Sequence, residues 1–346
     1  MTCMLPFKRI KLALFLTCLL IFGACVIGWL IHGVVATLML SNLDGWHSEF
    51  FPDGTRIVFS VPYNNRKQKG IYVFDREKRE AVRLTQPDYR DGFPSVFPDG
   101  QTIVFSRGNA TNTTLWVMDV DGSNKRALTS PPLFYADYGA FISPNGKYIA
   151  FFRKPFADLA DLLLLEFETA RITRLRRKVN HFAEGCFRWK NDEEIVFLSR
   201  TSHSSTISDP STSLDANIVN VQTGEVRKIV LPDKRRTGAY EDISFSTNQE
   251  LLILCPNKPY LYQLCIRKLF SEEEPYLLTD EQFNVSNALI HPKGESVLFG
   301  TTEFKDGSAY SRTFYFQVWD IKTLAFRRYL FYNFLHGSLR SVLPSL

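Results

Sequence analysis

The hydrophobic and polar positions of the chain follow a pattern that returns about every 46 residues. A turn-forming segment, Phe51-Pro52-Asp53-Gly54, precedes the apolar triplet Ile57-Val58-Phe59, and both return within residues 97–105 and 143–151. Degenerate copies begin at residues 189 and 245, and a sixth copy beginning at residue 291 recovers the pattern. The equivalent positions 52, 98, 144, 190, 246 and 292 are separated by 46, 46, 46, 56 and 46 residues. Such a register is typical of a repeat architecture.

Each copy predicts a set of short strands. Three successive apolar residues after the turn are typical of a strand buried on both faces. Gly54 and its equivalents, or Asp192 in the fourth copy, are residue types that tolerate a left-handed backbone, so we expect a tight turn in every copy. A second strand, such as residues 71–75, a third, such as 82–85, and the short segment before the turn complete four strands.

The repeat therefore predicts an all-β fold, a six-bladed β-propeller of four-stranded blades. We expect it to cover residues 41–331 and to leave residues 332–346 as a C-terminal tail. His291 stands where other copies have an aromatic residue or serine, which predicts a packing role.

An apolar segment precedes the repeats. No Asp, Glu, Lys or Arg occurs in residues 12–40, which exceeds the roughly 20 residues needed to cross a bilayer. Basic residues are concentrated before this segment in residues 1–11, and acidic residues follow it. By the positive-inside rule we expect a cytoplasmic basic N-terminus at 1–11 and a transmembrane signal anchor at 12–40. The propeller would then lie outside the cytoplasm, as on the periplasmic side of a cell inner membrane.

Two alternatives concern processing of this segment. A secretory signal peptide would be cleaved after small residues, and Val34-Val35-Ala36 is a candidate site. The residues before Cys25 also resemble a bacterial lipoprotein cleavage box, although the sequence stays apolar beyond Cys25. An uncleaved anchor is the preferred interpretation.

Composition and charge exclude several classes of protein. With 346 residues, 45% of them hydrophobic and 22% charged, the chain has the profile of a packed globular protein and not of a disordered one. Its net charge is +5, of which Lys8, Arg9 and Lys11 supply three. The two charges that remain are too few to indicate nucleic acid as a partner.

The cysteines do not form an obvious disulfide framework. Beyond the apolar segment they number three, Cys186, Cys255 and Cys265, each within an apolar run, which favours buried free thiols. A bridge between Cys255 and Cys265 stays open, although a turn near Lys258 would place Cys255 opposite Leu261 instead.

The Pro-Asp-Gly-x-x-Ile-x-Phe repeat, followed by strands such as Ile71-Tyr72-Val73-Phe74-Asp75, resembles the WD40-like (PD40) repeat of the TolB family of bacterial envelope propellers. The resemblance covers about residues 44–331 and implies fold more strongly than function. It implies a scaffold that recognises another envelope protein or a peptide. The chain departs from this family because its first copy follows the apolar segment directly, without the α/β domain that precedes the family's propeller.

Acidic residues recur five to eight positions before each turn, or close to that window. If the blades superpose, their carboxylates surround one end of the central channel and suit a cation, a basic peptide or a partner's Lys and Arg side chains. Acidic side chains at such loops also cap strand ends through backbone hydrogen bonds, which is the competing structural interpretation. The candidate residues are Asp44, Asp91, Asp137, Glu184, Glu241 and Asp242.

The alternative function is catalytic. Metal-dependent oligouronide lyases share the same type of repeat and bind their metal at the propeller axis, and His47 and His181 precede the first and fourth turns. No paired histidine spacing of metal-site type accompanies them. The sequence also lacks the Gly-x-Ser-x-Gly motif of propeller-bearing serine peptidases. Recognition without a cofactor is therefore the preferred interpretation, with the membrane contacted through residues 12–40.

Overall fold

The computed structural model describes residues 47–61, 70–78, 80–108, 112–155, 160–179, 187–200, 214–229, 243–245, 250–258, 261–268, 276–277, 284–293, 296–302, 314–320 and 326–332. Its regular secondary structure there is entirely β-strand. No helix in this part of the chain is long and apolar enough to cross a membrane. The predicted basic N-terminus, the signal anchor and nearly all of the predicted tail lie outside the described residues.

The described strands are β1 (Ser48–Phe50), β2 (Arg56–Val61), β3 (Gly70–Asp75), β4 (Glu80–Arg83), β5 (Arg90–Val96), β6 (Thr102–Gly108), β7 (Thr113–Asp119), β8 (Arg126–Ala127), β9 (Tyr135–Ile142), β10 (Tyr148–Pro155), β11 (Ala160–Glu166), β12 (Arg171–Val179), β13 (Phe187–Trp189), β14 (Glu194–Arg200), β15 (Leu214–Asn220), β16 (Val226–Ile229), β17 (Ile243–Phe245), β18 (Glu250–Lys258), β19 (Leu261–Lys268), β20 (Tyr276–Leu277), β21 (Asn284–Ile290), β22 (Ser296–Thr302), β23 (Phe314–Asp320) and β24 (Phe326–Tyr332).

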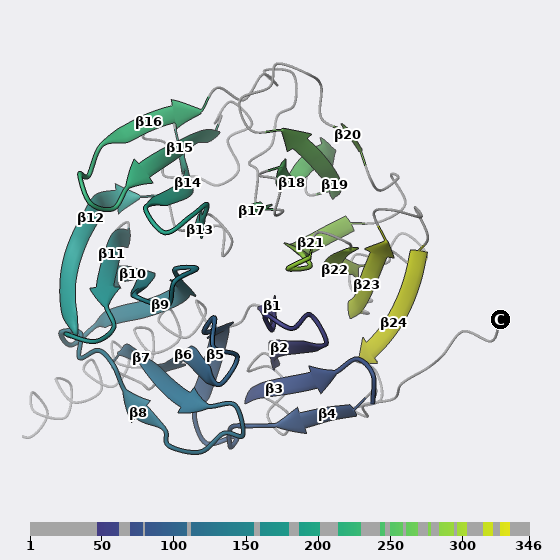
Figure 1. Cartoon of the computed structure of the whole chain (residues 1–346), viewed down its shortest axis with the longest axis horizontal. Coiled ribbons are helices and arrows are strands. Elements are labelled where there is room, and N and C mark those ends of the chain that lie inside the picture. The colour runs from purple at the N-terminus through teal and green to yellow at the C-terminus, as the bar shows by residue number, and fades with distance from the viewer. Residues whose placement is uncertain are drawn as a thin grey trace, which may run out of the picture.

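These strands form antiparallel groups of four in chain order, beginning with β1–β4 and ending with β21–β24. The groups β5–β8 and β9–β12 are joined into one sheet by a single parallel pair, Thr113 with Ala136. Figure 1 shows the groups arranged around a centre, with β1, β5, β9, β13, β17 and β21 innermost. Neighbouring innermost strands contact one another, and β21 contacts β1. The arrangement is propeller-like.

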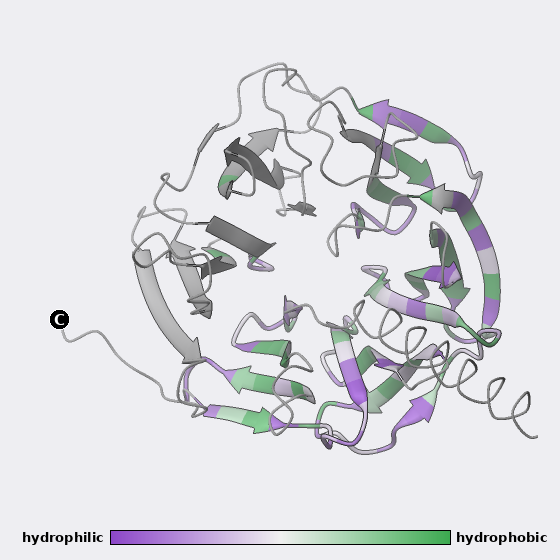
Figure 2. Ribbon diagram, turned by 180° about the vertical axis from the view of Figure 1, so that it is seen from behind, coloured by the Kyte–Doolittle hydropathy of each residue, from purple (hydrophilic) through white to green (hydrophobic). Residues whose placement is uncertain are grey.

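The core lies between the faces of neighbouring groups. Ile103, Val104 and Phe105 are all fully buried in β6, which confirms the prediction that the apolar triplets form strands covered on both faces. One apolar cluster joins residues of β2 and β3 to residues of β5–β7, and another joins β6 and β7 to β9–β11. The outermost strands differ, since β12 and β16 contain both hydrophilic and hydrophobic residues (Figure 2).

The turns after the innermost strands follow the predicted chemistry in the first three copies. Gly54, Gly100 and Gly146 have φ values of 72°, 65° and 73°, a region that favours glycine. In the fourth copy Asp192 is not among the described residues with positive φ, so the left-handed turn predicted there is wrong. Its side-chain Oδ1 instead accepts a hydrogen bond of 2.8 Å from the backbone N of Asn145, in the preceding group.

A side-chain acceptor recurs one residue before each of these positions. In the fourth copy Asn191 Oδ1 accepts hydrogen bonds from the backbone N of Glu193, at 2.9 Å, and of Glu194, at 2.8 Å. The same bond to the backbone N two residues on is made by Asp53, Asp99 and Asn145. These side chains hold the turn even where glycine is absent, because they replace a backbone acceptor.

The same turns touch from one group to the next. A Cβ placed on Gly100 would lie 3.9 Å from Cδ of Pro52, and one on Gly146 would lie 3.6 Å from Cδ of Pro98. The turns of the first three groups therefore share one side of the molecule, which we call the turn face. The segments that connect β4 to β5 and β8 to β9 enter the innermost strands at their other ends, on what we call the connection face.

His291 makes the equivalent contact between the last group and the first. Its Nε2 lies 3.2 Å from the backbone O of Gly54, and its ring meets the ring of Phe50 edge-on at 5.1 Å. The side chain is buried, which confirms its predicted packing role. The first and last groups are therefore in contact through side chains, without an exchange of strands among the described residues.

The register of β18 and β19 bears on the cysteines. Cys255 lies opposite Gln263, so the predicted pairing with Leu261 is wrong, and Cys265 lies opposite Ile253. The two cysteines are diagonal neighbours and not directly opposed. Diagonal Cα atoms are typically 7–8 Å apart, beyond the usual span of a disulfide.

Candidate functional site

Asp91 and Asp137 occupy the same position in two successive copies, near the start of β5 and β9. Arg107 donates to Asp91 through Nε and a terminal nitrogen, both at 2.7 Å. Arg153 makes the same two bonds to Asp137, at 2.6 and 2.7 Å. Both carboxylate side chains are fully buried, whereas the arginines retain 11% and 22% of their side-chain exposure. Each carboxylate is thus neutralised within its own group of strands.

The surroundings differ between the two pairs. The Arg107 guanidinium lies 4.3 Å from the ring centre of Tyr89 and 4.7 Å from that of Trp116, so aromatic faces cover it. Burial raises the pKa of Asp137 even though the hydrogen bonds from Arg153 oppose that rise.

The structure therefore brings Asp91 and Asp137 to one face and buries them with arginines that the sequence interpretation did not include. Asp44, Glu184, Glu241 and Asp242 lie outside the described residues. A role of the six carboxylates in binding stays a prediction. One sequence signal could have predicted these ion pairs, namely the spacing of 16 residues between the aspartate and the arginine, which occurs in both copies.

Two further charged residues belong to innermost strands on different sides of the centre, Glu49 on β1 and Arg188 on β13 (Figure 1). Oε2 of Glu49 accepts a hydrogen bond of 3.2 Å from the backbone N of Val96 in the next group. Burial of this carboxylate raises the pKa of Glu49 to about 7, and Ser95, Arg188 and Val96 only partly oppose that rise. The Arg188 guanidinium lies 3.9 Å from the ring centre of Phe141.

His47 is engaged in packing. Its residue is only 7% exposed, its ring centre lies 4.0 Å from that of Phe93, and its backbone N donates to Ser60 Oγ at 3.3 Å. His181, the other histidine of the metal interpretation, lies outside the described residues. Across the part of the chain that the structure describes, no group of three His, Cys, Asp or Glu side chains is placed to hold a metal.

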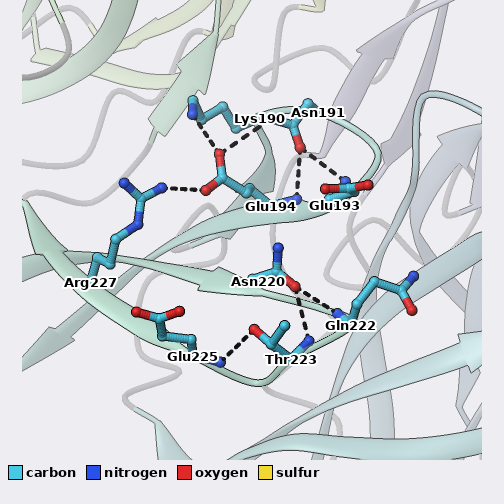
Figure 3. A network of polar contacts seen from close by, with 9 residues as sticks. All are labelled: Lys190, Asn191, Glu193, Glu194, Asn220, Gln222, Thr223, Glu225 and Arg227. Atoms are coloured by element: carbon cyan, nitrogen blue, oxygen red, sulfur yellow. Dashed lines mark hydrogen bonds and ion pairs between the residues drawn. The ribbon is translucent and has the colours of Figure 1, made fainter.

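A separate polar network joins the turns of the fourth group (Figure 3). Glu194 accepts a hydrogen bond of 2.6 Å from Lys190 Nζ and also pairs with Arg227. The bond from Lys190 is the main cause that lowers the pKa of Glu194. Asn220 supplies the acceptor for the neighbouring turn, bonding the backbone N of Gln222 and of Thr223. These contacts connect consecutive strands of one group, so we assign the network to local stability.

Comparison with curated proteins finds relatives that match only part of this chain. The chain is 37% identical over 83 residues to the Tol-Pal system protein TolB of Anaeromyxobacter dehalogenans, covering 23% of this chain and 18% of that protein. It is 29% identical over 120 residues to an uncharacterized protein of Agrobacterium fabrum, covering 34% of this chain and 39% of that one. The matched segments thus span well under half of either relative. No family model matches the chain.

Solved structures extend the likeness over most of the chain. TolB from Acinetobacter baumannii superposes with a TM-score of 0.54 at 13% identity, covering 82% of this chain and 62% of that one. A putative TolB from Agrobacterium tumefaciens superposes with a TM-score of 0.56 at 12% identity, covering 74% and 86%. The chain has a TolB-like β-propeller fold. At these identities the likeness establishes the fold alone.

Proposed function

We propose that this protein is a six-bladed TolB-like propeller, anchored by residues 12–40 in the cell inner membrane, that recognises an envelope protein or peptide at the mouth of its axis. The six groups of four strands, with β21 against β1, support the blade count and a closed ring. The partial matches to TolB, named for the Tol-Pal system, support recognition of a protein as the activity of such a propeller.

One observation carries the proposal: charged side chains of both signs converge on the innermost strands. Glu49 and Arg188 come from different sides of the centre and interact electrostatically. Asp91 and Asp137 lie on the innermost strands β5 and β9, and each is paired with an arginine of the adjacent strand, β6 or β10. A peptide or a loop of a partner carries backbone donors, backbone acceptors and charges, which such a lining can satisfy.

The geometry shifts the preferred contact residues from the predicted acidic ring to Glu49 and Arg188. Asp91 and Asp137 already use both oxygens on arginines, so a partner gains little from them directly. Arg188 is partly exposed and packs on an aromatic face, which is typical of an arginine that contributes strongly to a protein interface.

The test is capture of a partner by the full-length chain in its own membranes, using chemical cross-linking followed by solubilisation. Arg188→Gln and Glu49→Gln should each reduce recovery of the same partner about tenfold or more. Lys147→Gln is the matched control, because Lys147 is exposed on the turn side of β10 and its ammonium makes a long pair, 3.7 Å, with Glu166. Equal recovery with all three variants would show that the axial mouth is not the binding site.

Membrane anchoring is tested on the same preparation by extraction with alkaline carbonate. A chain anchored by residues 12–40 stays with the membrane pellet, whereas a cleaved chain or a peripheral one is released. Release of the chain would refute the anchoring part of the proposal, independently of partner capture.

A further inference from the structure

Of the five large apolar side chains that are exposed among the described residues, three belong to segments on the connection face. Among the described residues, Tyr89 is 48% exposed, Leu133 66% and Phe134 44%, and all three lie in the segments that lead into β5 and β9. Val82 and Ile172, which are also exposed, instead lie on the outermost strands β4 and β12. Exposed apolar side chains on one face of a protein are typical of a surface that contacts a partner or a membrane.

The backbone holds Leu133 and Phe134 outward. The backbone N of Tyr135 donates to the O of Pro132 at 3.2 Å, which closes a turn with Leu133 and Phe134 at its two central positions. Phe134 has a φ of 64°, a conformation that turns usually assign to glycine. A bulky residue there is strained, and its exposed ring recovers little of that strain through burial. The preceding Pro131-Pro132 pair stiffens the same segment.

The chain reaches the first strand from this same side. β1 is the innermost strand of its group, as β5 and β9 are of theirs, and the turns that follow these strands share the opposite face. His47 therefore leads into β1 from the connection face. Residues 41–46 separate the apolar segment from His47, and six residues span at most about 20 Å. If residues 12–40 cross the bilayer, the connection face lies within that distance of its surface.

The charges of this face suit such a position. The carboxylates of Asp91 and Asp137 are already neutralised by arginines, so approach to lipid head groups does not expose them. The half-buried Arg90 and Lys154 lie at the same strand ends, near the exposed Asp88. Tyr89, with an apolar ring and a polar tip, suits the head-group level.

We propose that the edge of the connection face formed by the segments before β5 and β9 rests on the membrane that holds the anchor, with Leu133 and Phe134 inserted among the lipids. The inference rests on the proposed anchoring. It orients the axial mouth toward the membrane surface, where a partner embedded in the same membrane, or a segment close to it, can reach Glu49 and Arg188. A protein partner seated on Leu133 and Phe134 is the competing occupant.

The experiment places the photoreactive residue p-benzoylphenylalanine at Phe134 in the purified full-length chain, reconstituted in vesicles of phosphatidylethanolamine and phosphatidylglycerol. Matched probes replace Val82, an exposed apolar residue on an outermost strand, and Lys147, an exposed residue on the turn side. After irradiation, adducts are identified by mass. We expect lipid adducts at Phe134 to exceed those at both control positions at least tenfold.

The outcomes separate the inference from the proposal on which it depends. Equal lipid labelling at all three positions, or labelling of Phe134 mainly by a second copy of the chain, would overturn the lipid contact. In native membranes, an adduct between the probe at Phe134 and a different protein would also overturn the lipid contact. Carbonate extraction of each sample reports anchoring separately, so an anchored chain without a lipid adduct refutes the orientation alone.

Discussion

Replacing Gly54 with alanine tests the contact between the first and last groups of strands. Gly54 has a φ of 72°, and a Cβ there would overlap the imidazole ring of His291. His291 is buried against Phe50, so its ring must leave the space that it occupies. Gly224 is the matched control, since it also has a φ of 72° but a Cβ on it would meet nothing within 4 Å.

The expected magnitudes follow from this difference. Gly224→Ala carries the left-handed strain alone, roughly 1 kcal/mol after the gain from a less flexible unfolded chain. Gly54→Ala adds loss of the contact between His291 Nε2 and the Gly54 carbonyl, about 1 kcal/mol, and of the edge-on packing against Phe50, about 1 kcal/mol. Repacking of a crowded site adds about 1–3 kcal/mol. Gly54→Ala should therefore cost roughly 3–5 kcal/mol more than Gly224→Ala.

The assay is thermal unfolding of the full-length chain in mild detergent, followed by circular dichroism at several scan rates. The double variant Gly54→Ala/His291→Ala completes a cycle, because removal of the ring frees the space that the new methyl group needs. In the His291→Ala background, Gly54→Ala should cost no more than Gly224→Ala. Equal losses of stability for the two single glycine variants, or additive losses in the double variant, would show that the contact between His291 and Gly54 does not close the ring.

Three further outcomes are expected from the same unfolding measurements. Burial raises the pKa of Glu49 from 4.5 to about 7, so its stabilising contribution is complete below about pH 4.5 and is lost by about pH 7. The free energy of unfolding of the wild type should therefore fall by roughly 3 kcal/mol across that window relative to Glu49→Gln. Parallel pH profiles of the two proteins would contradict this. Asp137→Asn leaves the Arg153 guanidinium without its carboxylate and should lower the free energy of unfolding by about 3–5 kcal/mol. Lys147→Gln should lower it by under about 0.5 kcal/mol. Similar losses for the two variants would show that the buried pair does not stabilise the fold. Phe134→Gly removes a strained, exposed side chain and should leave the unfolding temperature unchanged or higher, so a marked loss of stability would mean that the ring packs in the folded state.

The strands were predictable because their signal is local. Ile103-Val104-Phe105 is apolar without alternation, and the structure buries all three residues in a strand covered on both faces. The positive φ of Gly54 was predictable for the same reason, since only a few residue types tolerate it. The fourth turn is present, but the left-handed backbone expected of Asp192 was predicted wrongly. Its side chain instead bonds Asn145 in another group, which no local pattern reveals.

The pairing of charged residues in the candidate site depends on the register of adjacent strands, and the sequence repeat does not indicate that register. Ser95 lies opposite Val104, and continuing that register would place Asp91 opposite Gly108. A one-residue irregularity between Gly92 and Ser95 shifts the pairing, so Asp91 lies opposite Arg107 instead. The same irregularity in the third group pairs Asp137 with Arg153. One extra residue in each group therefore pairs an arginine with a carboxylate that was predicted to line the channel mouth.

The amino-acid sequence was sufficient for the all-β class, the position of the turns and the apolar strands, because spacing and residue type constrain the backbone within a few residues. The charge state of the mouth required the folded chain, since Glu49 meets Val96 and Arg188 only after separate groups of strands pack around the centre. The contact of His291 with Gly54 joins residues 237 positions apart. Contacts of that range arise from the closure of the ring, and their free energies depend on burial and distance that no local pattern encodes.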